Sequence, residues 1–321
     1  MEIESVIPEL HVAPSPHLSE SGRSTRRMMV DVLIALVPVT VTALYIFQWY
    51  AAKQLVVCLI SCLAAEALFT KMRHQRLHLN DFSAAVTGII LALSLPGTAP
   101  WYIGFIASFV AMGIGKVIFG GLGMNLFNPA MVGRAFVMIA FAGLMGATGY
   151  QNAHSTVDVI TQATPLTAFK QSGVGIPLSS LFWGLTNGSL GETSAVACLL
   201  GGIFLCVRRT ASWEIPVGVL AATGILASID ALVSPGSVWT PLHHLLGGAL
   251  LFGAFFIATD PVSSPVTPKG KLIFGIGIGV LVMVLRLFSG YPEGVMFAVL
   301  LMNGITPLIN RWTIPTPLGG K

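Results

Sequence analysis

Apolar residues along this chain gather into long runs that short polar segments separate. A helix that spans a membrane needs about 20 mainly apolar residues, because the hydrocarbon core of a bilayer is about 30 Å thick. The pattern predicts ten such helices, near residues 29–48, 53–70, 80–95, 99–119, 128–147, 193–207, 214–233, 243–259, 271–289 and 293–310. The third and sixth runs are short. We therefore expect an all-α polytopic membrane protein with about ten transmembrane helices.

Composition supports the same conclusion. Only 9% of the 321 residues are charged and 54% are hydrophobic, whereas a soluble domain carries roughly 25% charged residues. The net charge of +4 does not indicate nucleic-acid binding, because the charges lie at the ends of apolar runs. The first apolar run begins near Met28 after a polar, acidic segment, so we expect no cleaved signal peptide.

The lysines and arginines predict an orientation, because loops on the cytoplasmic side of a membrane are enriched in them. With the N-terminus in the cytoplasm, fourteen of the 17 basic residues fall on the inner side. The three on the outer side are Lys53, Lys170 and Arg286. Ten helices then place both termini in the cytoplasm and the long loop 148–192 outside.

The sequence also contains a weak internal repeat. The segments 91–100 and 256–265 both carry P-x-x-x-P after an apolar run rich in small residues, and five predicted helices separate them. A repeat unit with an odd number of helices is inverted in the membrane, and such repeats place a functional site near the midplane. The competing explanation is chance similarity between two apolar stretches. The expected segments are 1–27 (cytoplasmic), 28–147 (first five-helix repeat), 148–192 (outer loop), 193–310 (second five-helix repeat) and 311–321 (cytoplasmic tail).

Several polar residues lie where apolar residues are expected. A charge within a membrane span is costly, about 3 kcal/mol at the centre, so it is a candidate functional group. Asp31, Glu66 and Asp260 are therefore candidates for an ion pathway. Ion pairing with Arg134 or Arg286 is the alternative for the first two. A turn made by the Asp-Pro dipeptide is the alternative for Asp260.

The segment 116–130, before the fifth helix, combines three glycines with two asparagines. The amides of Asn125 and Asn128 offer donors and acceptors that suit the edge of a flavin or quinone ring. Asn128 before Pro129 also reads as a helix N-cap, which does not explain Asn125. The four cysteines all lie inside apolar runs, without the Cys or His spacing of a metal site, so no metal is expected.

The segment Thr161-Gln162-Ala163-Thr164-Pro165-Leu166 resembles the flavin attachment site of the RnfD/NqrB family, membrane subunits of the Rnf complex and of the sodium-pumping NADH:quinone reductase. The family pattern is roughly [ST]-G-A-T, and Gln162 stands here in place of its glycine. Further segments resemble the family in the same order along the chain: Ser15-Pro16-His17, 120–130, Gly191-Glu192-Thr193-Ser194, Thr259-Asp260-Pro261 and Tyr291-Pro292-Glu293-Gly294. Without a long N-terminal extension, the chain is more similar to RnfD than to NqrB.

This resemblance implies a fold of two inverted five-helix repeats, similar to urea transporters. It implies FMN joined through its phosphate to Thr164 by a flavin transferase, and a noncovalent riboflavin near Asn125 and Asn128. It also implies a subunit of a bacterial or archaeal cytoplasmic-membrane complex, with A-, B-, C-, E- and G-type subunits as partners. That complex couples electron transfer between ferredoxin and NAD to translocation of Na⁺ or H⁺. The alternatives are a flavin-free channel or transporter for a small polar solute and a purely structural membrane anchor.

Overall fold

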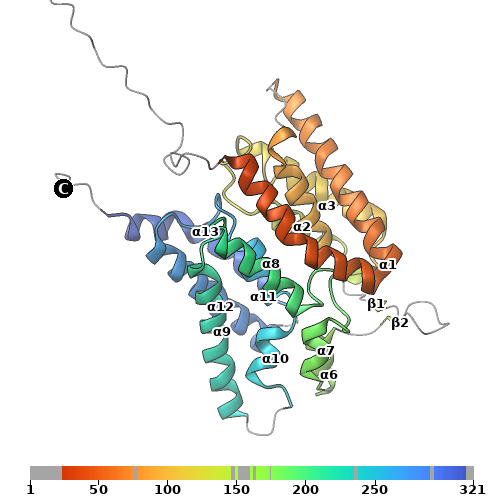
Figure 1. The fold of residues 1–321 in the computed structure, drawn as a ribbon, viewed down its shortest axis with the longest axis vertical. Coiled ribbons are helices and arrows are strands. Elements are labelled where there is room, and N and C mark those ends of the chain that lie inside the picture. Colours follow the sequence, from red (N-terminus) through yellow and green to blue (C-terminus); the bar gives the residue numbers. More distant parts are fainter. Residues whose placement is uncertain are drawn as a thin grey trace, which may run out of the picture.

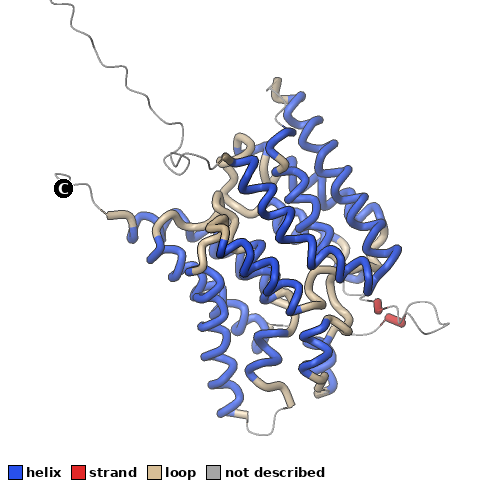
Figure 2. The backbone as a smooth tube through the Cα atoms, viewed as in Figure 1, coloured by secondary structure: helices blue, strands red, loops and turns tan. Residues whose placement is uncertain are grey.

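The computed structural model describes residues 24–74, 79–145, 149–150, 160–161, 164–173, 175–234, 238–289 and 293–315. Helices make up most of this part of the chain, as the apolar runs predict (Figure 2). A small antiparallel ribbon is formed by β1 (Gly149–Tyr150) and β2 (Ile160–Thr161). Four predicted features fall outside the described residues: Ser15-Pro16-His17, Gln162-Ala163, Tyr291-Pro292 and most of the segment 1–27.

Helix α1 (Thr25–Met72) contains the first two predicted helices. Its 48 residues would extend about 72 Å as one straight helix, more than twice the thickness of the hydrocarbon core. Gln48 interrupts the helix with φ 46° and ψ −121°. The two arms run in opposite directions on either side of this residue (Figure 1). α1 is therefore two antiparallel helices, as the separate runs 29–48 and 53–70 predict.

The other elements of the first half pack around α1. α2 and α3 lie against it, and α4 packs on both. The bounds are η1 (Leu79–Asp81), α2 (Ser83–Ser94), α3 (Trp101–Gly113), η2 (Val117–Phe119), α4 (Pro129–Ala140) and α5 (Ala142–Met145). The predicted helix 128–147 stops at Ala140, because Phe141 leaves the helical conformation with φ −130° and ψ 43°.

The second half begins after two short helices, α6 (Pro165–Ser172) and α7 (Leu178–Trp183). α12 packs between α9 and α13, and α10 packs on α9. The bounds are α8 (Ala195–Val207), α9 (Glu214–Val233), α10 (Pro241–Leu246), α11 (Leu250–Phe252), the π-helical η3 (Gly253–Ile257), α12 (Pro268–Phe288) and α13 (Val295–Thr313).

The predicted helix 243–259 is broken rather than continuous. α10 ends at Leu246, and Gly248 adopts φ +69°, a left-handed conformation that favours glycine. The Arg286 guanidinium donates to the carbonyl oxygens of His244 at 2.6 Å and Gly247 at 2.9 Å. These bonds satisfy backbone groups that the break releases, which is what a break inside an apolar region requires.

The two halves meet closely at α8. A Cβ atom on Gly201 would lie 2.1 Å from the Ala35 carbonyl oxygen, so only glycine permits this approach of α8 to α1. α4 and α13 form a second contact between the halves. Within the described residues, five helices are long and apolar enough to cross a membrane: α1, α3 with η2, α9, α12 and α13. α2, α4 and α8 are apolar but shorter.

Candidate functional site

Thr164 lies at the N-terminus of α6, where its side chain caps the helix. Its Oγ1 accepts from the Thr167 backbone N–H at 3.2 Å, and the Thr164 and Thr167 hydroxyl oxygens are 2.8 Å apart. Pro165 occupies the first helical position, which suits proline because that position needs no backbone donor. The local sequence therefore fixes the Thr164 hydroxyl at the positive end of a short helix.

Aromatic and polar contacts hold α6 against the second half of the protein. The Phe169 ring stacks on Trp239 with a centroid distance of 4.8 Å. The Lys170 ammonium donates to the carbonyl oxygens of Arg286, at 3.2 Å, and Ser289. These contacts fix α6 against the end of α12, and thereby fix the position of Thr164.

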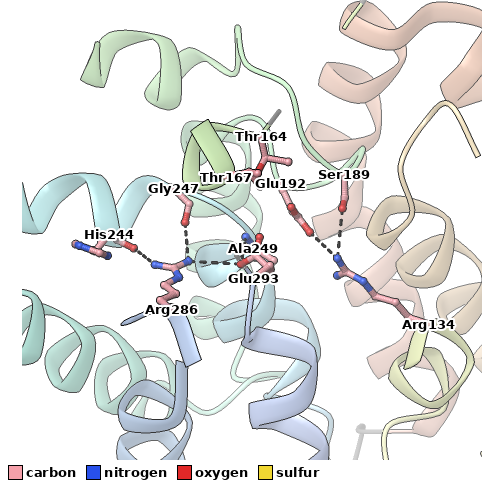
Figure 3. Close-up of polar contacts among 10 residues, drawn as sticks. All are labelled: Arg134, Thr164, Thr167, Ser189, Glu192, His244, Gly247, Ala249, Arg286 and Glu293. Carbon is pink, nitrogen blue, oxygen red and sulfur yellow. Dashed lines mark hydrogen bonds and ion pairs between the residues drawn. The ribbon is translucent and has the colours of Figure 1, made fainter. Parts of the chain in front are cut away.

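A small cavity opens beside Thr164. Its polar lining includes Thr186, Asn187, Glu192 and Glu293. Figure 3 shows both glutamates near Thr164, each paired with an arginine from an apolar helix. The sequence prediction did not assign these charged residues to the site. The available signal was that Arg134 and Arg286 lie inside apolar runs, where a buried partner is required.

A second, larger cavity has both predicted asparagines in its wall. Asn128 caps α4 as predicted, because its Oδ1 accepts from the Met131 N–H at 3.3 Å and Pro129 follows it. Its amide nitrogen donates to the Ile257 carbonyl at 3.3 Å. The Asn125 amide donates to the Phe127 carbonyl at 3.0 Å.

The two cavities lie at opposite ends of α8. Glu192, three residues before α8, lines the Thr164 cavity, and Leu205, near the end of α8, lines the larger one. α8 has 13 residues, which correspond to about 20 Å. The candidate sites at Thr164 and at Asn125 and Asn128 are therefore separated by much of the thickness of the protein.

Asp31 and Glu66 both form ion pairs, but with partners other than the predicted ones. The Asp31 carboxylate accepts from the Arg208 guanidinium at 3.2 Å and the Thr210 hydroxyl at 3.0 Å. Glu66 pairs with the buried Lys116, whose ammonium also donates to the Ser83 hydroxyl at 2.6 Å. The prediction of Arg134 or Arg286 as partners was wrong, because both arginines bind glutamates at the other cavity.

Asp260 closes a turn and lines the larger cavity. Its carboxylate accepts from the Ser263 hydroxyl at 2.8 Å and from the Val262 N–H at 3.4 Å. This is the geometry that the Asp-Pro alternative predicts. Among the described residues, no group of three or more His, Cys, Asp or Glu side chains is placed to hold a metal ion.

Comparison with known proteins places the whole chain in one family. The sequence profile of the NQR2, RnfD, RnfE family matches residues 11–319. The chain belongs to this family. The D subunit of the Na⁺-translocating ferredoxin:NAD⁺ oxidoreductase complex of Acetobacterium woodii is 42% identical, over 95% of this chain and 93% of that protein.

Two further relatives in the family also match along nearly their full length. The D subunit of the proton-translocating ferredoxin:NAD⁺ oxidoreductase complex of Clostridium ljungdahlii is 37% identical over 97% of this chain and 96% of its own length. The D subunit of an ion-translocating oxidoreductase complex of Yersinia pseudotuberculosis is 37% identical over 97% of this chain and 99% of its own length. The names of the first two relatives differ in the translocated ion, so similarity to them does not assign an ion to this chain.

Proposed function

We propose that this chain is the D subunit of a membrane complex that transfers electrons between ferredoxin and NAD⁺ and couples this transfer to translocation of Na⁺ or H⁺. The observation that carries the proposal is the match to the D subunits of such complexes over nearly the full length of both chains. The partners are the other subunits of the complex, of the A, B, C, E and G types. No complete activity is expected of this polypeptide alone.

The second part of the proposal is that FMN is joined through its phosphate to the Thr164 hydroxyl by a flavin transferase. The position of Thr164 supports this attachment. A phosphate diester on an N-cap side chain lies at the end of a helix dipole that favours negative charge, and α6 provides that end. The Thr167 N–H and hydroxyl lie within hydrogen-bonding distance of Thr164 Oγ1, the oxygen that would carry the phosphate.

The cavity beside Thr164 suits the attachment point rather than the whole group. It is smaller than sites that enclose a small molecule. A bound flavin supplies one- and two-electron transfer. The chain itself contributes the anchoring hydroxyl, the docked α6 helix and two buried ion pairs at the cavity wall.

Riboflavin is proposed for the larger cavity. Asn125 and Asn128 both contribute to its wall, and the Asn125 amide oxygen is available beyond the bond described above. Asp260 lines the same space. Asp31, Glu66 and Asp260 remain proposed ion-pathway residues, with the first two held in ion pairs and Asp260 held in its turn.

For the fold, we propose ten membrane crossings in two inverted five-helix repeats, similar to urea transporters, with both termini in the cytoplasm. Each half contains two helices, then a short or broken helical segment that ends in a proline-containing loop, and then two more helices. The segment is α2 in the first half and α10, α11 and η3 in the second. This correspondence supports an inverted repeat, and the distribution of basic residues supports a flavin at Thr164 on the outer side.

The mass of the intact purified chain tests the flavin attachment. We expect the wild-type chain to carry an added flavin phosphate mass and to fluoresce on a denaturing gel. Thr164→Ala should lose both signals completely. Thr167→Ala, which removes the adjacent hydroxyl, is the matched control and should retain covalent flavin.

Fluorescence of Thr164→Ala on the denaturing gel would contradict the assignment of the attachment site. An unmodified wild-type mass, after expression together with a flavin transferase, would favour the flavin-free channel or transporter instead.

A further inference from the structure

Four charged side chains lie beside Thr164, and the function proposed above does not explain why they are charged. They form two ion pairs, Arg134 with Glu192 and Arg286 with Glu293. Arg134, Glu192 and Arg286 are each 9% exposed or less, and the Glu293 side chain is 16% exposed. Both glutamates line the cavity that Thr164 lines (Figure 3). Buried charges are costly, so this cluster requires an explanation beyond packing.

The two ion pairs are unequal. Arg134 donates to Glu192 Oε1 at 3.0 Å and to the Ser189 hydroxyl at 3.3 Å. Arg286 lies 3.5 Å from Glu293 Oε1, and its shorter bonds go to two backbone carbonyl oxygens. The backbone N–H of Ala249 provides the shorter bond to Glu293, at 2.9 Å. Glu293 is therefore the carboxylate with the weaker charge compensation.

The surroundings of Glu293 favour its protonated form. It lies in the connection between α12 and α13, before the span that begins at Val295. Burial raises the pKa of Glu293, and the charge of Glu192 raises it further. Arg286, Arg134 and the Ala249 N–H act in the opposite direction. Two carboxylates that share one small cavity are not both ionised without cost, and this repulsion favours the protonated form of Glu293.

We propose that Glu293 is a proton-binding residue of the Thr164 cavity, and that its protonation is linked to the charge on a flavin joined to Thr164. The link rests on the attachment proposed above, whereas the proton-binding site stands on the ion-pair geometry. At a pH high enough to ionise Glu293 while the flavin is oxidised, one electron arriving at the Thr164 flavin from an iron–sulfur or flavin carrier of a partner subunit is matched by one proton. That proton moves from bulk water onto a Glu293 carboxylate oxygen and forms an O–H bond. The net charge in the cavity then stays constant.

The first experiment does not depend on flavin. Infrared spectra of the full-length chain carrying Thr164→Ala, recorded at neutral pH in H₂O and D₂O, should show a protonated carboxyl band that Glu293→Gln removes. Glu214→Gln, which changes a glutamate at the start of α9, is the matched control and should leave this band unchanged. A band that persists in full after Glu293→Gln would overturn the proton-binding site.

The second experiment measures the link in the complete complex. In the wild type, the slope of the Thr164 flavin midpoint potential against pH should change above neutrality, at the pH at which Glu293 loses its proton, and Glu293→Gln should remove that bend. Glu192→Gln should shift the bend to lower pH, because it removes the negative charge that raises the Glu293 pKa. The second variant keeps the test valid where Glu293→Gln does not fold.

The outcomes separate this inference from the proposed function. If the flavin midpoint potential depended on pH in the same way in the wild type and both variants, with covalent flavin retained, the link would be overturned. If Glu293→Gln removed the carboxyl band but the wild-type chain had an unmodified mass, the proton-binding site would stand and the flavin attachment would be overturned instead.

Discussion

At the scale of single residues, Gly248 determines the shape of the Thr164 cavity. Its φ of +69° is left-handed, and a Cβ atom there would lie 2.7 Å from both Glu293 carboxylate oxygens and from Leu166 Cδ1. Leu166 follows Thr164 by two residues, so this one glycine separates the α6 N-terminus from the carboxylate. A larger residue at position 248 must displace one of them.

We therefore predict that Gly248→Ala destabilises the protein by more than backbone strain alone. Gly173, with φ +65° and no atom within 4 Å of an added Cβ, is the matched control for that strain. Gly173→Ala should cost about 1 kcal/mol, and Gly248→Ala should cost about 1–3 kcal/mol more from overpacking. Thermal unfolding in detergent measures both. Equal losses in the two variants would show that the cavity wall relaxes freely around the new methyl group.

The buried pair of Glu66 and Lys116 gives a second prediction at this scale. Lys116 is 2% exposed, and 50 positions in the sequence separate the two partners. Removing one member of a buried ion pair leaves the other uncompensated, at a cost of about 3–5 kcal/mol. Glu66→Gln or Lys116→Met alone should lose this much stability, and the double variant should recover most of it.

Denaturant unfolding of the two single variants and the double variant tests the pair. Additive losses in the double variant would mean that the two groups act independently. Loss of ion translocation in a stable double variant would favour the ion-pathway role of Glu66 over a purely structural one.

At the scale of elements, α1 shows a turn that local sequence does not signal. Neither glycine nor proline occupies position 48, yet Gln48 has a positive φ between two long helices. In a continuous helix, glycine is about 1 kcal/mol less favourable than alanine. At a residue with positive φ, glycine relieves strain of about 1–3 kcal/mol. The sign of the stability change caused by a glycine at position 48 therefore distinguishes a continuous helix from one that is interrupted there.

We predict that Gln48→Gly raises the melting temperature of the purified protein. Ala52→Gly, four residues later inside the second arm, is the control and should lower it, because position 52 has helical geometry. A loss of stability in both variants would mean that α1 is a single bent helix and that the first two predicted spans are one.

Apolar runs predicted where helices form, because burial in lipid or protein core requires apolar side chains along the whole length of a helix. They did not predict the break after Leu246, since the run 243–259 remains apolar through it. The glycines at 247 and 248 were the local signal, and Arg286, about 40 residues away, completes the break with its guanidinium. Tertiary bonds of this kind have no local pattern.

The candidate site was predictable to a similar degree. The Asn128 cap followed from a local rule, because the side chain and the N–H that it binds are three residues apart. The ion pairs around Thr164 follow from no local rule, because Arg134 and Glu192 are 58 positions apart and Glu293 lies in the other half of the chain. Their pairing follows from the packing of α4, α8 and α12, not from spacing.

At the scale of the whole molecule, the basic residues predict which cavity faces the cytoplasm. Met124 and Leu185 report on the two sides, because they are 69% and 57% exposed and lie in the loop before α4 and in the loop before α8. Cys58, Cys62 and Cys198 are buried, and Cys206 is partly exposed. A Cys206→Ser background therefore allows single introduced cysteines to be labelled selectively.

In this background, Leu185→Cys should react with a membrane-impermeant maleimide added to intact spheroplasts, and Met124→Cys should react only after permeabilisation. The reason is that fourteen basic residues lie on the predicted inner side and three on the outer side, so the reversed orientation costs free energy. The opposite labelling pattern would show that the protein has the reverse orientation in the membrane, with Thr164 on the cytoplasmic side. Labelling of both positions from outside would contradict the odd number of crossings between them, and with it the inverted repeat.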